Sequence, residues 1–149
     1  MENSAFSGEY NNTIDEKGRI IFPAKLRTLL STSRLVITRG IDCCLWIFQL
    51  EEWNALSEKV MQSASLFQAH SRLVLRRLIA PAQELEIDKA GRLSIPHSLR
   101  EYAHLEKECI ILGINRYIEL WDAAEYQTYL KGSDADFYQA SEDLGIIRF

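Results

Sequence analysis

Residues 15–23 read DEKGRIIFP and residues 88–96 read DKAGRLSIP, so one unusual stretch occurs twice at an offset of 88 − 15 = 73 residues. The match continues beyond each proline at this offset, with Leu26-Arg27 returning as Leu99-Arg100, Gly40 as Gly113 and Phe48 as Trp121. A repeat sets the architecture of a chain, because one small unit cannot bury its apolar face alone. The sequence therefore predicts two copies of one unit, related by pseudo-symmetry.

The size and composition of the chain fit one compact domain or two tightly joined halves. Its 149 residues can bury a substantial core, whereas half of that length would be marginally stable alone. A hydrophobic content of 47% and a charged content of 26% are ordinary for a soluble globular protein. No apolar stretch approaches the roughly 18 residues of a membrane span, and residues 1–5 lack signal-peptide features. We therefore expect a cytoplasmic protein.

The net charge of −4 argues weakly against a nucleic-acid partner, but its distribution matters more than its sum. Residues 101–149 hold 10 acidic and 4 basic residues, a balance of −6, so residues 1–100 sum to −4 − (−6) = +2. Basic residues gather there in three places: Lys17, Arg19, Lys25 and Arg27; Arg72, Arg76 and Arg77; and Lys89, Arg92 and Arg100. An acidic chain can thus carry a basic face.

The residues with metal-binding or catalytic potential form no recognisable set. An odd number of cysteines fits reduced thiols, and neither the cysteines nor the histidines show metal-ligand spacing. These residues are Cys43, Cys44, Cys109, His70, His97 and His104. There is no Gly-rich phosphate loop and no apparent pairing of a nucleophile with a base. We expect no catalytic residues, no metal and no cofactor.

Each copy reads as a strand, a turn, a second strand, a short helix, two more strands and a longer helix. Asp-x-x-Gly predicts the turn, because an Asp side chain can bond to its own backbone and Gly tolerates the closing geometry. We therefore interpret Asp15 and Asp88 as turn formers. In the strands that follow, the period of two places Arg19 and Arg92 on the face opposite the larger apolar residues.

The expected elements follow from the same patterns. Strands are predicted at residues 10–14, 19–22, 35–38, 44–48, 83–87, 92–95, 109–112 and 117–121, with short helices at 24–30 and 97–103. An amphipathic connecting helix is predicted within residues 65–80, and a helix capped by Asp122 should stop near Gly132. Interleaving the strands of both copies would give an α+β fold, a small mixed β-barrel with both turns on one side.

The turn motif resembles a known DNA-binding domain. Asp-x-x-Gly-Arg, followed by three residues and Pro, is similar to the swapped-hairpin (AbrB/SpoVT-like) domains of bacterial transition-state regulators and antitoxins. Two such units, together with three flanking motifs, resemble the MraZ family from Phe6 to about Leu130. The flanking motifs are Phe6-x-Gly8-Glu9-Tyr10, Leu50-x-x-Trp53 and Ile118-Glu119-Leu120-Trp121. Residues 1–5 lie outside this resemblance as an extension.

This resemblance implies an organisation and a function. The units would span residues 6–53 and 81–130, joined by connecting helices at 54–80 and followed by an acidic tail at 131–149. The family implies a sequence-specific, DNA-binding transcriptional regulator, which we interpret as a repressor, of a bacterial division and cell-wall gene cluster. It also implies a ring-shaped homo-octamer in the cytoplasm, associated with the nucleoid and bound to tandem short promoter repeats on double-stranded DNA.

The resemblance implies Arg19 as a DNA contact, and repetition extends this expectation to Arg92. The alternative for both is a surface salt bridge with Asp15 or Asp88. Lysines and a further arginine are candidates for phosphate contact, with simple solvation open for Lys25 and Arg27, while Gly18 and Gly91 would let each turn approach a duplex closely. The candidate DNA-binding residues are Lys17, Gly18, Arg19, Lys25, Arg27, Lys89 and Arg92, with Asp15, Asp88 and Gly91 shaping the turns.

Two other function classes are open. A protein-binding oligomeric scaffold, or an antitoxin-like module without sequence-specific DNA binding, would fit the net charge of −4 and the replacement of Lys17 by Ala90 in the second turn. An enzyme is the more distant alternative, because the sequence offers no catalytic set.

Overall fold

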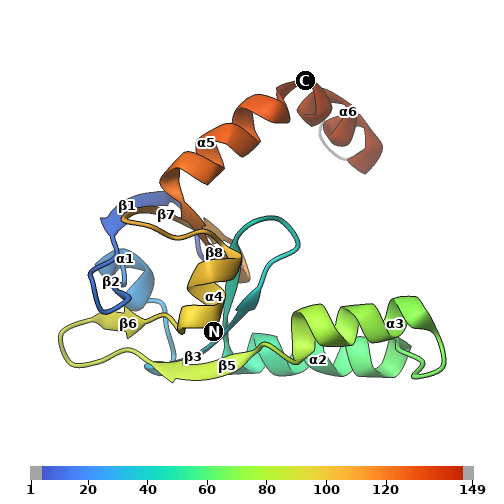
Figure 1. Ribbon diagram of the computed structural model, residues 1–149, viewed down its shortest axis with the longest axis horizontal. Helices are drawn as coiled ribbons and strands as arrows, with labels where there is room; N and C mark the ends of the chain where they lie inside the picture. The colour runs from blue at the N-terminus through green and yellow to red at the C-terminus, as the bar shows by residue number, and fades with distance from the viewer. Residues whose placement is uncertain (1–4, 146–149) are drawn as a thin grey trace.

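A β-sheet core carries two helical arms that leave it in different directions in the computed structural model (Figure 1), which describes residues 5–145. All of the expected N-terminal extension except Ala5, and residues 146–149 of the acidic tail, lie outside the described residues. The green arm consists of helices between the two units, and the orange-red arm follows the last strand. The core between the arms therefore contains both copies of the repeat.

Six strands form one antiparallel sheet in the order β1-β7-β8-β4-β3-β5, and two form a separate antiparallel ribbon. The sheet strands are β1 (Glu9–Thr13), β3 (Arg34–Arg39), β4 (Leu45–Gln49), β5 (Gln83–Glu86), β7 (Glu108–Ile114) and β8 (Tyr117–Asp122). The ribbon strands are β2 (Arg19–Ile21) and β6 (Arg92–Ser94). The α+β class expected from the sequence is confirmed, and the sheet curves around the core without closing.

Strands of the two units interleave, as expected. Strand β1 of the first unit pairs with β7 of the second, and β5 of the second unit pairs with β3 of the first. In the ribbon, β2 pairs with β6 in the register Arg19↔Ser94, Ile20↔Leu93 and Ile21↔Arg92. Because the strands are exchanged in this way, each unit completes the β-structure of the other.

Short helices follow the two repeated prolines, which suit the start of a helix. They are α1 (Ala24–Arg27) and α4 (His97–Tyr102). The first ends three residues before the expected Leu30, because Leu29 and Leu30 donate to carbonyls three residues back, at Leu26 and Arg27, and tighten the chain into a turn.

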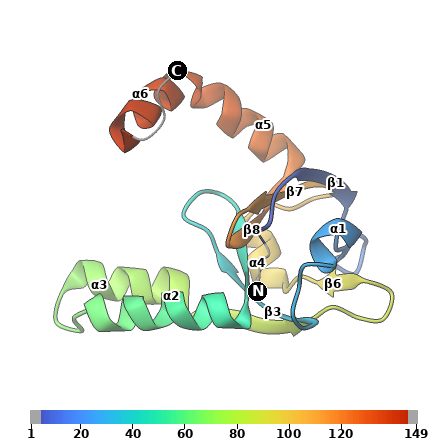
Figure 2. The ribbon, with the colours of Figure 1, turned by 180° about the vertical axis from the view of Figure 1, so that it is seen from behind.

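The arms contain the remaining helices, which are α2 (Leu50–Ser63), α3 (Ala69–Val74), a π-helix η1 (Leu75–Ile79), α5 (Ala123–Gly132) and α6 (Asp134–Leu144). Helices α2 and α3 lie side by side (Figure 2), joined by a tight connection. As predicted, the Asp122 side chain caps α5 by accepting from the Glu125 amide at 3.2 Å, and α5 stops at Gly132. The acidic tail continues as helix α6 through Leu144.

The core is built from equivalent residues of both units. Three pairs at the 73-residue offset lie in the core, and each of the six side chains is at most 3% exposed. The pairs are Ile20 and Leu93, Phe22 and Ile95, and Leu26 and Leu99. Burying such a side chain contributes about 1.5–3 kcal/mol. The predicted alternation in β2 and β6 is therefore confirmed, since the apolar pairs face inward.

The β3–β4 hairpin is one residue longer than the equivalent β7–β8 hairpin, so the constant offset of 73 residues does not hold for both of its strands. Gln49 and Asp122 are 122 − 49 = 73 residues apart, but their partners Leu35 and Cys109 are 109 − 35 = 74 apart. The two hairpins differ accordingly. In the first, Gly40 pairs with Cys44 around three residues, whereas Ile114 pairs with Tyr117 around two. The longer loop contains Cys43.

Candidate nucleic-acid interface

The outward face of the β2–β6 ribbon presents both repeated arginines. The alternation that buries Ile20 and Leu93 turns Arg19, Ile21, Arg92 and Ser94 to the other side. Ile21 is 57% exposed, although it is apolar and lies at the centre of the ribbon. This face is therefore a small open surface with a guanidinium on each strand.

Each turn is shaped by its aspartate. The Asp15 Oδ1 atom accepts from the backbone amides of Lys17 and Arg19, both at 2.9 Å, and Gly18 adopts a φ of +80°. These amides, that of Arg19 first, lower the pKa of the Asp15 carboxyl.

The second turn reproduces this geometry at the 73-residue offset. The Asp88 Oδ1 atom accepts from the amides of Ala90 and Arg92 at 2.9 Å, and Gly91 has a φ of +82°. The pKa of Asp88 is lowered too, with the Arg92 amide as the largest cause. Both turns therefore hold an ionised aspartate beside an arginine.

Each repeated arginine pairs with the aspartate of its own turn. The Arg19 Nε–Asp15 Oδ2 distance is 2.8 Å and the Arg92 Nε–Asp88 Oδ2 distance is 3.0 Å. These are the salt bridges that the sequence left as an alternative. They engage only Nε, and within residues 5–145 no other side-chain hydrogen bond of either guanidinium occurs. The pairs therefore orient each fork while its two terminal NH₂ groups stay available to an acceptor.

A second pair of arginines lies across the turns, each on the turn of the other unit. A Cβ atom added to Gly18 would lie 2.6 Å from Arg100 Cζ, and one added to Gly91 would overlap the Arg27 guanidinium. Arg100 is held by a 3.0 Å hydrogen bond from its Nε to the Ile95 carbonyl. A protein guanidinium thus lies against each turn glycine. The sequence shows that Arg27 and Arg100 are equivalent at the repeat offset, but it does not show which turn each one contacts.

Backbone hydrogen bonds fix each turn to the opposite strand. Phe22 N donates to the Gly91 carbonyl and Ile95 N donates to the Gly18 carbonyl, both at 2.8 Å. The two turns consequently lie at opposite ends of one ribbon, on the same side of the molecule.

The remaining candidate side chains surround the ribbon. Lys17, Lys25, Arg27 and Lys89 are exposed. Lys89 occupies the position of Glu16 in the first turn, while Ala90 occupies that of Lys17. Each turn therefore carries one lysine, and the second turn lacks the glutamate of the first.

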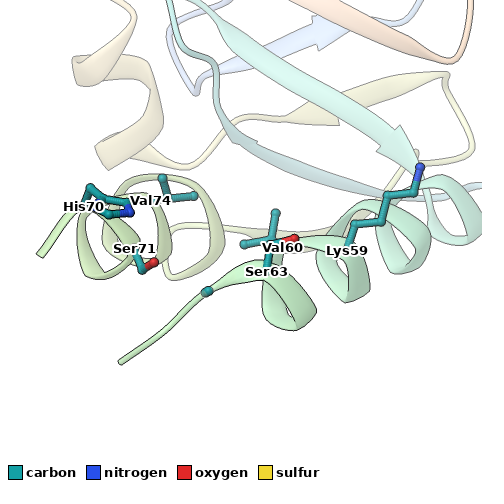
Figure 3. A pocket seen from close by; sticks show the side chains of 7 residues that line it. Lys59, Val60, Ser63, His70, Ser71 and Val74 are labelled. Atoms are coloured by element: carbon teal, nitrogen blue, oxygen red, sulfur yellow. The ribbon is translucent and has the colours of Figure 1, made fainter. Parts of the chain in front are cut away.

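A pocket of about 370 Å³ lies between α2 and α3 (Figure 3). The residues that line it are Lys59, Val60, Ser63, Ala64, His70, Ser71 and Val74. They offer one imidazole and one amine but neither a carboxylate nor a thiol. The pocket therefore offers no carboxylate–imidazole or thiol–imidazole pair.

Tertiary structure also assembles a cluster that the sequence spacing did not indicate. Cys43, His104 and Glu125 place their ligand atoms within 4.8 Å of one another. They are distant in sequence and belong to different elements, so no spacing rule could find them. None of them belongs to the ribbon.

Comparison with known proteins supports the resemblance carried by the turns. The family model described as "MraZ protein, putative antitoxin-like" matches residues 5–77 and again residues 78–145. The chain belongs to the MraZ family. A transcriptional regulator MraZ of Treponema denticola is 60% identical over 143 residues, which cover 96% of this chain and 99% of the relative. The transcriptional regulator MraZ of Treponema pallidum (strain Nichols) is 55% identical over 144 residues, covering 97% of each chain.

The two matches of the MraZ model coincide with the tandem arrangement seen in the strands, so the expected family and repeat are confirmed. MraZ relatives of this similarity are named transcriptional regulators, which places the chain in that broad class. Among residues 5–145, no helix combines the length and apolarity needed to cross a membrane.

Proposed function

We propose that this MraZ-family chain binds double-stranded DNA in a sequence-specific manner and regulates transcription through that contact. The observation that carries the proposal is the outward face of the β2–β6 ribbon, with Arg19 and Arg92 held at turns of the same geometry. The sequence left a salt bridge as the alternative for both arginines. The pairing through Nε is compatible with both a salt bridge and a DNA contact, because it orients the guanidinium and leaves its two NH₂ groups free to donate.

The chemistry of DNA recognition fits this face. A two-stranded ribbon can enter the major groove, where an arginine fork can pair with guanine O6 and N7. We assign base reading to Arg19 and Arg92, and phosphate contact to the exposed Lys17, Lys25 and Lys89. The turn glycines, each buried against a protein guanidinium, would act by shaping the turns. Arg27, which lies against Gly91 and is exposed, would add charge beside the second turn.

Assembly would multiply this contact. We propose a ring-shaped homo-octamer, as the family resemblance implies, whose protomers engage tandem short repeats in a promoter upstream of a division and cell-wall gene cluster. Weak individual contacts then combine through effective concentration. Bound in this way near the nucleoid, the protein would act as a repressor.

A gel-shift titration with DNA from the chain's own upstream region tests the proposal. Arg19→Ala should weaken DNA binding strongly. If the Arg19 guanidinium also contacts a phosphate, the slope of the logarithm of the binding constant against that of the salt concentration should fall by about one. Arg116→Ala is the matched control, because Arg116 is exposed in the β7–β8 turn and outside the ribbon. Equal affinity of Arg19→Ala and the unmodified protein would refute the assignment.

A protein-binding scaffold is the second candidate. Large exposed apolar residues on both arms favour it, among them Leu73 on α3 and Phe137 and Tyr138 on α6. The same titration separates the two functions. No retardation of the upstream DNA at micromolar protein and moderate salt would favour the scaffold.

A further inference from the structure

Three potential metal ligands meet where the first unit contacts the second. Cys43 lies in the three-residue loop between β3 and β4, His104 follows α4, and Glu125 lies in the first turn of α5. The Cys43 Sγ–His104 Nδ1 distance is 3.6 Å, and the His104 Nδ1–Glu125 Oε2 distance is 3.1 Å. A thiol, an imidazole and a carboxylate are the side chains that bind zinc in proteins.

The distances suit a tetrahedral centre. Zinc bonds of about 2.3 Å to sulfur and about 2.0–2.1 Å to nitrogen and oxygen place sulfur about 3.6 Å from nitrogen and nitrogen about 3.3 Å from oxygen. The observed separations of 3.6 and 3.1 Å are close to these values, so a small adjustment of side-chain torsions would complete three corners.

The surrounding backbone holds the three residues in place. Tyr102 donates from its hydroxyl to the Gly40 carbonyl at 2.8 Å, which ties the β3–β4 hairpin to α4. His104, two residues further along the chain, adopts a left-handed conformation with a φ of 54°, which is uncommon for residues other than glycine. Asp122 accepts from the Glu106 and Glu125 amides at 3.2 Å and so fixes the first turn of α5. Such support is what a preorganised metal site requires.

Hydrogen bonding accounts for only part of the convergence, because the Cys43 thiol can donate to the Tyr102 carbonyl at 3.8 Å while His104 Nδ1 donates to Glu125. Both Cys43 Sγ and Glu125 Oε2 face the same nitrogen, His104 Nδ1, and one ring nitrogen carries at most one proton. A cation placed between them would satisfy all three groups together.

The pseudo-symmetric position supports a cation at this place. At the 73-residue offset, Cys43 corresponds to Arg116 and Glu125 corresponds to Glu52. Arg116 NH1 lies 3.6 Å from Glu52 Oε2, so in the other half of the molecule a guanidinium provides the positive charge beside the carboxylate. In the first hairpin the arginine is replaced by a thiol, and an imidazole lies beside it.

We propose that Cys43, His104 and Glu125 bind one Zn²⁺ ion, with the fourth position open to water. The ion would clamp the β3–β4 hairpin of the first unit onto the base of the α5 arm. The His104 side chain is 63% exposed, which leaves an entry path. The ligands are shared between the units but are separate from the ribbon, so the proposal does not depend on DNA binding.

Zinc titration of the chelator-treated full chain, in competition with a chromogenic chelator, tests the site. We expect one Zn²⁺ per chain, a rise in the thermal midpoint on binding, and a cobalt–thiolate absorption when Co²⁺ is substituted. Cys43→Ser and His104→Gln should each weaken binding by more than the roughly 10–100-fold that loss of an outer-shell partner costs. His97→Gln is the matched control, because His97 pairs with Glu101 at 3.4 Å in an exposed position without a thiol nearby.

Four results would count against the site. The first is failure of the unmodified chain to bind Zn²⁺ at micromolar concentration, and the second is a Co²⁺ spectrum without thiolate absorption. The third is unchanged affinity in Cys43→Ser or in the independent variant Glu125→Gln, each verified as folded by circular dichroism. A loss of affinity in His97→Gln equal to that in His104→Gln would likewise count against it.

Discussion

Gly18→Ala tests the contact between the two units at the first turn. Gly18 is buried, has a φ of +80°, and lies against the guanidinium of Arg100. A Cβ atom there would lie 2.6 Å from Arg100 Cζ and 2.7 Å from its Nε. The methyl group therefore meets both a backbone constraint and an occupied space.

The expected cost has two parts. A residue with a Cβ atom in the left-handed region costs roughly 1–2 kcal/mol. Displacing Arg100 breaks the 3.0 Å hydrogen bond from its Nε to the Ile95 carbonyl. Because the Arg100 side chain is flexible and half-exposed, water replaces part of this bond, and its loss costs about 0.5–1.5 kcal/mol. We expect Gly18→Ala to lower the free energy of unfolding by about 1.5–3.5 kcal/mol in total.

Urea unfolding followed by circular dichroism, at one fixed protomer concentration, measures this cost. Gly132→Ala is the matched control, because its Cβ would meet nothing within 4 Å and Gly132 ends helix α5. That substitution should be neutral or stabilise the chain slightly. In an Arg100→Ala background, Gly18→Ala should cost only the backbone part, roughly 1–2 kcal/mol.

Two results would refute this reasoning. A cost of Gly18→Ala that is the same with and without Arg100 would show that the guanidinium does not occupy the space above the glycine. A cost no greater than that of Gly132→Ala would contradict both the strained conformation and the contact.

Three further predictions concern the turn, the core and the helix cap. The Arg19 amide lowers the pKa of Asp15, so this carboxylate stabilises the folded chain fully at any pH above the pKa of an unfolded aspartate. That stability is lost as the pH falls through the lowered pKa of Asp15 in the folded chain. A carbon-detected NMR titration that gives Asp15 a midpoint at or above the ordinary pKa of aspartate would contradict this. Leu93→Ala should cost about 2–5 kcal/mol by urea unfolding because Leu93 is fully buried, whereas Leu73→Ala, at a position 54% exposed, should cost far less. Asp122→Ala should cost about 1–2 kcal/mol, since the side chain caps α5, and amide hydrogen exchange should show faster exchange at Glu125.

The fold was largely predictable because its determinants are local. The alternation in residues 19–22 and 92–95 identified the buried faces, and the cap at Asp122 and the stop at Gly132 follow from side-chain chemistry within one turn of helix. The repeat predicted the interleaving of strands, since neither copy could cover its own apolar face. Helix α1 ended earlier than expected because competing short-range hydrogen bonds at Leu29 and Leu30 decide the last turn.

The sequence alone established the tandem units, the aspartate turns and the outward position of Arg19 and Arg92, because periodicity and turn chemistry act over a few residues. Only the tertiary structure showed Arg100 against Gly18, Arg27 against Gly91, and the convergence of Cys43, His104 and Glu125. These contacts depend on the register in which one unit pairs with the other and on the length of the β3–β4 loop. A one-residue change in either displaces a side chain by several ångströms, and no pattern within a single unit encodes that distance.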